Sequence, residues 1–181
     1  GGIIDAHDGF AWYRCAVKIP ADWKGRNLAL HLGQIDDCDE TFFNGSKVGA
    51  HGTIQPYRSA SGDTRDYPIP AAQVDFGGWN LIAVRVWDGG GAGGISAGDL
   101  RIDCGLGSLS LHGNWEFRTG DDASWAKWPV ESAAAKAALG EAFARDAGRS
   151  FGKLLDHTPL ANTAPLTLDG DIASALVAGV D

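Results

Sequence analysis

Residues 80–88, NLIAVRVWD, decide the fold class of this chain. The run has the length of a β-strand and is rich in aliphatic and β-branched side chains. The glycine-rich stretch GGGAGG at 89–94 follows it directly, and so many glycines continue neither a strand nor a helix. The run therefore predicts a strand, and its partners have to lie elsewhere in the chain.

Two strands with alternating side chains are predicted before this run. In residues 10–19 (FAWYRCAVKI), every second side chain points to the core, and this buried face consists of Tyr13, Cys15, Val17 and Ile19. The second strand begins at Leu28, alternates as far as Leu32 and ends at Gly33. Both patterns are typical of strands with one buried face.

A hairpin is predicted over residues 35–49, because Asn44-Gly45 supplies the two positive φ angles of a type I′ turn. Residues 50–66 are polar and irregular, so we expect a long loop. Tyr67-Pro-Ile-Pro70 follows, and its two prolines are compatible only with the edge of a sheet.

Short strands are predicted at 99–104 and 108–118, where the β region ends. Residues 131–146 (ESAAAKAALGEAFARD) consist of strong helix formers and predict one helix. The residues after it predict an irregular tail. We expect one all-β domain over 5–118 and a helix-containing C-terminal appendage over 119–181 that a neighbouring domain could share.

The composition of the chain narrows the classes of partner that it could bind. The chain has 181 residues with 26 Gly, seven Trp and seven Phe, which suits an all-β fold. Its net charge is −8 and its Lys and Arg are scattered, so no nucleic-acid partner is predicted. No apolar run approaches the roughly 20 residues that cross a bilayer, so no membrane partner is predicted either. The chain contains no Met, which suggests an excised or processed domain.

No metal or other cofactor is predicted. Cys15, Cys38 and Cys104 lack the spacing of a zinc site and could form at most one disulfide. The glycine-rich stretch lacks the GK[ST] ending of a phosphate loop. The acidic residues of 36–40 lack the spacing of a calcium loop. We expect these acids to pair with arginines, and the predicted structural charge pairs involve Arg14, Asp37 and Arg85.

Six motifs follow one another along residues 5–118. They are Asp8-Gly-Phe-Ala-Trp-Tyr-Arg14, residues 32–39 (LGQIDDCD), Asn44-Gly45 with Val48-Gly49, residues 65–70 (RDYPIP), residues 79–88 (WNLIAVRVWD) and residues 111–115 (LHGNW). In order and spacing they resemble the jelly-roll, galactose-binding-like module of sialate O-acetylesterases. That module is similar to the sugar-binding β-sandwich domain of family 2 glycoside hydrolases, so the resemblance implies a jelly-roll β-sandwich.

The resemblance also implies a function. It suggests a non-catalytic accessory module, structural and substrate-shaping, whose partner is the SGNH-type esterase domain of the same parent chain, in the periplasm or secreted. The alternative is a carbohydrate-binding module that recognises a sugar through its rim loops. A third reading, an autonomous serine esterase, rests on the GxSxG pattern at 94–98, with Ser96 as nucleophile and His112 or His157 as base. A glycine run precedes this pattern and a strand pattern follows it, instead of the strand and helix that flank a nucleophile elbow, so no catalytic residue is assigned.

The candidate contact site lies on loops, because the loops of a sandwich gather at its two rims. The residues predicted to contact a ligand or partner are Tyr57, Arg58, Arg65, Trp87, Asp88, Gly93 and Gly94. Four tryptophans at turns or beyond the sandwich are further candidates for stacking on a sugar, namely Trp23, Trp79, Trp125 and Trp128. Those within strands are expected to pack, namely Trp12, Trp87 and Trp115.

Overall fold

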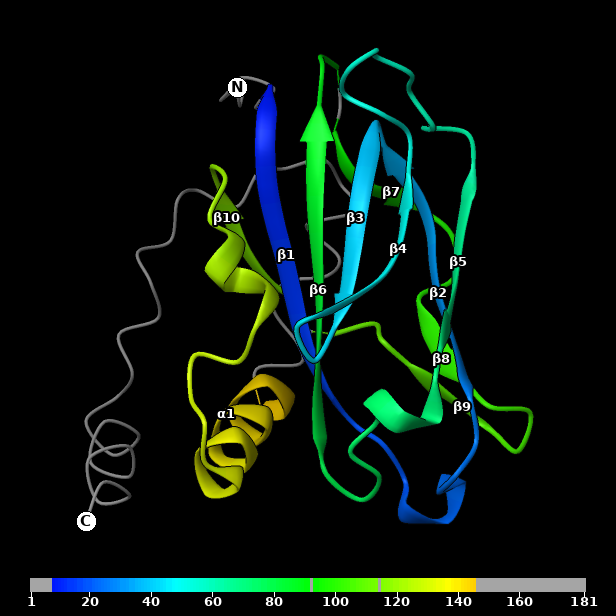
Figure 1. Ribbon diagram of the computed structural model, residues 1–181, viewed down its shortest axis with the longest axis vertical. Coiled ribbons are helices and arrows are strands. Elements are labelled where there is room, and N and C mark those ends of the chain that lie inside the picture. Colours follow the sequence, from blue (N-terminus) through cyan, green and yellow to red (C-terminus); the bar gives the residue numbers. More distant parts are fainter. Residues whose placement is uncertain (1–7, 92, 114, 146–181) are drawn as a thin grey trace.

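The computed structural model describes residues 8–91, 93–113 and 115–145. Two antiparallel sheets lie face to face (Figure 1), which confirms the predicted jelly-roll β-sandwich. The strands are β1 (Gly9–Lys18), β2 (Leu28–Asp36), β3 (Cys38–Phe43), β4 (Ser46–His51), β5 (Thr64–Ile69), β6 (Trp79–Asp88), β7 (Gly94–Ala97), β8 (Arg101–Asp103), β9 (Ser108–Ser110) and β10 (Glu116–Thr119). The helices are the short 3-10 helices η1 (Ala21–Trp23), η2 (Ala71–Gln73) and η3 (Ala123–Ala126), and α1 (Ala133–Arg145).

The first sheet has the order β10-β1-β6-β3-β4, so the strand that decides the fold lies at its centre. Strand β6 pairs with β1 along the whole length of both, from Gly9 opposite Asp88 to Lys18 opposite Trp79. It is buried on both faces, because Ile82 and Val84 point into the core and Ala83 packs on the outer side. This burial explains why its sequence is a continuous apolar run.

The second sheet has the order β5-β2-β8-β9, and β7 also pairs with β2. The proline-containing strand β5 lies at the edge, as predicted. The core lies between the sheets and includes the alternating residues predicted for it, namely Tyr13, Cys15, Val17, Ile19, Leu28, Leu30 and Leu32. The hairpin turn is also confirmed, because φ is positive at both Asn44 and Gly45.

Two predicted strand boundaries are wrong. Gly33 does not end β2, which continues to Asp36 through a shift in register. A Cβ at Gly33 would lie 2.0 Å from the carbonyl oxygen of Ala97, so glycine here permits the close approach of β7. Residues 108–118 do not form one strand either, since β9 belongs to the second sheet and β10 to the first. Leu111 and Trp115 are buried where the chain crosses between the sheets.

The segment after β10 lies on the outer face of the first sheet (Figure 1). Here Trp12 is only 1% exposed, because Ala126 and Trp125 of the segment and Phe42 of β3 cover it. Helix α1 confirms the helix predicted at 131–146, and the predicted tail lies outside the described residues. No described helix has the length and apolar character needed to cross a membrane.

Candidate functional site

Two loops meet at the end of the sandwich drawn at the top of Figure 1. One joins β4 to β5, and the other joins β6 to β7. The Asp37 carboxylate links them, because it accepts hydrogen bonds from the Ser59 hydroxyl at 2.5 Å and from the Gly89 amide at 3.0 Å. We call Asp37, Tyr57, Ser59, Trp87 and residues 89–91 the rim surface.

The rim surface carries an aromatic pair. The ring centroids of Tyr57 and Trp87 are 5.4 Å apart and the rings meet edge to face. Tyr57 is 55% exposed and Trp87 is half-buried. Most large apolar side chains of the described residues are covered, so an exposed Tyr57 that packs on a half-buried Trp87 is the kind of feature that marks a contact surface.

The carboxyl groups of Asp36 and Asp37 titrate differently. Burial raises the pKa of Asp36, and the neighbouring Asp37 raises it further. Burial also opposes ionisation of Asp37, but the hydrogen bonds from Ser59 and Gly89 outweigh it and hold the pKa of Asp37 below its ordinary value. Of the two carboxyl groups, Asp37 is therefore the one that ionises more readily.

The glycines of the β6–β7 loop play two roles. Gly90 and Gly91 have positive φ angles, and no atom lies within 4 Å of where a Cβ would be, so their backbone is open to an approaching molecule. At Gly93, by contrast, a Cβ would lie 2.3 Å from Oδ2 of Asp88. The open part of the loop is thus 90–91, and Gly93 serves local packing.

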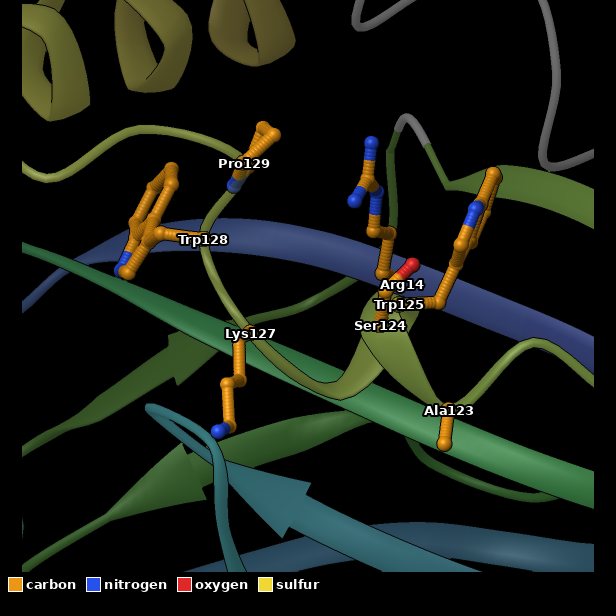
Figure 2. A pocket seen from close by; sticks show the side chains of 7 residues that line it. All are labelled: Arg14, Ala123, Ser124, Trp125, Lys127, Trp128 and Pro129. Atoms are coloured by element: carbon orange, nitrogen blue, oxygen red, sulfur yellow. The ribbon is translucent and has the colours of Figure 1, made fainter.

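A hollow of about 520 Å³ lies elsewhere, on the outer face of the first sheet. Figure 2 shows its lining, in which Arg14 of β1 stands between Trp125 on one side and Trp128 with Pro129 on the other. Sequence analysis flagged both tryptophans as candidates for stacking. It missed the hollow, because Arg14 and residues 123–129 are far apart in the chain.

Comparison with known proteins gives partial structural overlaps. No family model and no curated protein matches the chain. A β-glucuronidase from Ruminococcus gnavus is 19% identical over 48% of this chain and 14% of its own, with a TM-score of 0.40. A β-D-glucuronidase from Dictyoglomus thermophilum is 22% identical over 52% of this chain and 14% of its own, with a TM-score of 0.36. A glycosyl hydrolase family 2 member from Bacteroides cellulosilyticus is 28% identical over 49% of this chain and 12% of its own, with a TM-score of 0.41.

The chain thus covers 12 to 14% of the length of these enzymes. Of these three names, that of the Bacteroides cellulosilyticus protein includes glycosyl hydrolase family 2. The overlaps are too partial to carry a conclusion about activity, and the link to sialate O-acetylesterases stays a prediction.

The structure separates the predicted contact residues into two groups. Tyr57 and Arg58 are exposed, and Trp87 and Gly93 are half-buried, so these residues lie at or near the surface. The remaining three, Arg65, Asp88 and Gly94, are buried. Of the other tryptophans, Trp12, Trp23 and Trp115 are buried in the fold, and Trp79 is half-buried beneath Gly140 of α1.

Arg65 is a correction to the predicted site. Its side chain is 0% exposed, and its Nε lies 2.9 Å from Oδ1 of Asp39. Its other nitrogens donate to the carbonyl oxygens of Ile35, Asp37, Ala60 and Asp63. Arg65 therefore holds the β4–β5 loop from inside and does not face a ligand.

Of the predicted charge residues, Arg85 pairs with an acid of 36–40 as expected, whereas Arg14 and Asp37 have other partners. Arg14 pairs with Glu116 of β10 instead of an acid of 36–40. Arg85 pairs with Glu40, and also with Asp121 beyond the sandwich. Asp37 is held by the hydrogen bonds of the rim surface. The missed partners lie in residues 116–121, and no local sequence pattern points to them.

The GxSxG pattern lies largely in strand β7, a strand that the sequence did not predict. The Ser96 hydroxyl donates to the carbonyl oxygen of Gln34 at 3.3 Å. Nε2 of His112, one of the two candidate bases, lies 3.7 Å from Oδ1 of Asp99. His157 lies outside the described residues. Within residues 8–91, 93–113 and 115–145, no group of three His, Cys, Asp or Glu side chains is placed to hold a metal ion, and the three cysteines are free thiols.

Proposed function

We propose that this chain is a non-catalytic, carbohydrate-binding accessory module of a larger carbohydrate-active enzyme, and that its rim surface contacts the sugar. The observation that carries the proposal is the aromatic pair of exposed Tyr57 and half-buried Trp87, which lies beside the ionised carboxylate of Asp37, itself 6% exposed. Aromatic rings bind the apolar faces of sugar rings, while a carboxylate accepts hydrogen bonds from hydroxyl groups.

The rim surface also offers access. Because Gly90 and Gly91 carry no side chain and have open space around them, a sugar can approach the backbone there, although the Gly90 amide already donates to Oδ1 of Asp88. The Ser59 and Gly89 hydrogen bonds fix Asp37, so the acceptor is positioned before any ligand arrives. A preorganised acceptor next to aromatic rings is a common composition for a small-molecule site.

The parent enzyme that we propose is a carbohydrate O-acetylesterase similar to sialate O-acetylesterases. The support is the series of six motifs over residues 5–118. In such a protein the module would lie beside an SGNH-type esterase domain, in the periplasm or outside the cell, and would help to shape the substrate site.

The test is a titration of the labelled full chain with galactose, sialic acid, O-acetylated sialic acid and xylo-oligosaccharides, followed by amide chemical shifts. We expect at least one sugar to shift the amides of 57–59 and 87–91. Tyr57→Ala should weaken that binding about tenfold, the effect of losing one aromatic contact. Leu106→Ala is the matched control, because Leu106 is 59% exposed and lies in the β8–β9 turn.

The proposal fails if none of these sugars shifts the rim amides. It also fails if Leu106→Ala weakens binding as much as Tyr57→Ala, because the rim surface would then not be the contact.

A further inference from the structure

We propose that the hollow on the outer face of the first sheet binds a sugar ring that carries a carboxylate, such as a hexuronic acid. This site is separate from the rim surface and does not depend on its function. Two tryptophans and the Arg14 guanidinium meet there in a volume of about 520 Å³ (Figure 2). That volume lies in the range of small-molecule sites.

The charge of the lining is the first argument. Among the described residues that line the hollow there are two cations, Arg14 and Lys127, and no carboxylate. The chain as a whole has a net charge of −8. Glu116, which is not part of the lining, pairs with the Nε of Arg14, so the positive charge left at the lining is that of Lys127 and of the terminal Nη groups of Arg14, and it favours an anionic ligand at this place.

The geometry of Arg14 is the second argument. Its Nε donates to Glu116, and its guanidinium lies 4.2 Å from the centroid of the Trp125 ring. These two contacts fix the side chain, which is only 14% exposed. Figure 2 shows the guanidinium directed between Trp125 and Pro129, and the described residues provide no acceptor for its terminal Nη groups. A planar guanidinium with free terminal donors matches a carboxylate.

The walls supply the apolar part of the site. Trp125 and Trp128 are half-buried, so each keeps part of its indole surface open to solvent. The Nε1 of Trp128 donates to Oδ1 of Asn44 at 3.3 Å, which orients this ring against the β3–β4 hairpin. Indoles placed beside a guanidinium bind a ring and its carboxylate together.

The experiment compares galacturonate with galactose, two sugars that differ in the carboxylate at C6. Binding to the full chain is followed by calorimetry and by the indole N–H resonances of Trp125 and Trp128. We expect galacturonate to shift these resonances and to bind at least about tenfold more tightly than galactose, since the carboxylate adds a charge-assisted hydrogen-bonded pair.

Three variants locate the binding. Arg14→Lys keeps the charge but removes the planar donor pair, and it should weaken galacturonate binding about tenfold. Trp128→Ala should weaken it to a similar degree, and it keeps Arg14 with its pair to Glu116 in case Arg14→Lys folds poorly. Lys24→Gln is the control, because it removes one exposed positive charge outside the lining of the hollow, and it should change the affinity little.

Equal binding of both sugars, or absence of any shift at the two indoles, would overturn the proposal. So would a loss of affinity in Lys24→Gln as large as in Arg14→Lys, because non-specific charge attraction would then explain the binding.

Discussion

Nε of Arg65 lies 2.9 Å from Oδ1 of Asp39, and neither side chain has any exposed surface. Arg65 comes from β5 at the edge of the second sheet and Asp39 from β3 of the first, so the pair joins the two sheets. Oδ2 of Asp39 also accepts hydrogen bonds from Thr41 at 2.9 Å and from Tyr67 at 2.7 Å. Both charges are therefore satisfied inside the protein, as a buried ion pair requires.

Asp39→Asn and Arg65→Met should each lower the free energy of unfolding by about 3 to 5 kcal/mol, because each leaves the other partner buried without its counter-charge. The comparison variant is Arg118→Met, which breaks the exposed pair with Asp122 and should cost at most about 1 kcal/mol. Urea denaturation measures all three. If Asp39→Asn and Arg118→Met had the same free energy of unfolding, the buried pair would contribute no more to stability than the exposed pair.

Stability should decrease as the pH falls below about 4, the ordinary range of carboxyl groups. A hydrogen bond from Lys47, together with Arg85, lowers the pKa of Glu40, and Arg85 lowers the pKa of Asp121. A carboxyl whose folded pKa is depressed stabilises the fold above its unfolded pKa, and that contribution is lost as the pH falls through the folded pKa.

The measurement is urea denaturation at several pH values between 7 and 2.5. Arg85→Gln should reduce the loss of stability on acidification by less than about 1 kcal/mol, because its partners are partly exposed. If this variant lost as much stability between pH 5 and pH 2.5 as the parent, Arg85 would not be the cause of these lowered pKa values.

Gly49→Ala should destabilise the protein by about 1 to 3 kcal/mol, the usual cost of forcing a methyl group into a packed site. A Cβ at Gly49 would lie 2.0 Å from the ring of Tyr67. The matched control is Gly62→Ala, where no atom lies within 4 Å of the added carbon, and this variant should be neutral or slightly more stable. Thermal melting of both variants checks the difference, and equal melting temperatures would contradict the packing argument.

The chain should not hydrolyse p-nitrophenyl acetate. Acyl transfer needs a nucleophile, a base and an oxyanion hole in register, whereas Ser96 lies in strand β7 and its hydroxyl donates to a main-chain carbonyl. Ser96→Ala should therefore behave as the parent in this assay. Turnover by the parent that disappears in Ser96→Ala would show that the serine is a nucleophile after all.

Strands β1 and β6 and the Asn44-Gly45 hairpin were predictable because their signals are local: alternation, an apolar run and a turn that needs positive φ angles. The role of Gly33 was not predictable, because it depends on the carbonyl of Ala97, a residue far away in sequence. The break between β9 and β10 was not predictable either, because it depends on the strands with which each segment pairs. The alternation continues through residues 108–118 while the chain changes sheets.

The rule that loops meet at a rim predicted which side chains lie together, and their contact with a ligand or partner stays a prediction. Tyr57 and Trp87 do lie together, although 30 residues separate them in the chain. Arg65 was misplaced, because a charged residue after a polar loop suggests exposure, and only the position of Asp39 in the other sheet makes burial favourable. The hollow at Arg14 depends on a segment that packs back from beyond the sandwich, and residue patterns contain no signal for that return.

The cover over Trp12 determines how this domain could be transplanted into another protein. A fragment cut at residue 118, where the strand pattern ends, would lose Trp125 and Ala126 and leave the Trp12 indole uncovered next to Ala83. The truncated domain would expose a new apolar patch and would tend to aggregate. The smallest portable unit therefore extends at least through Ala126, and any fusion partner is better joined after that point.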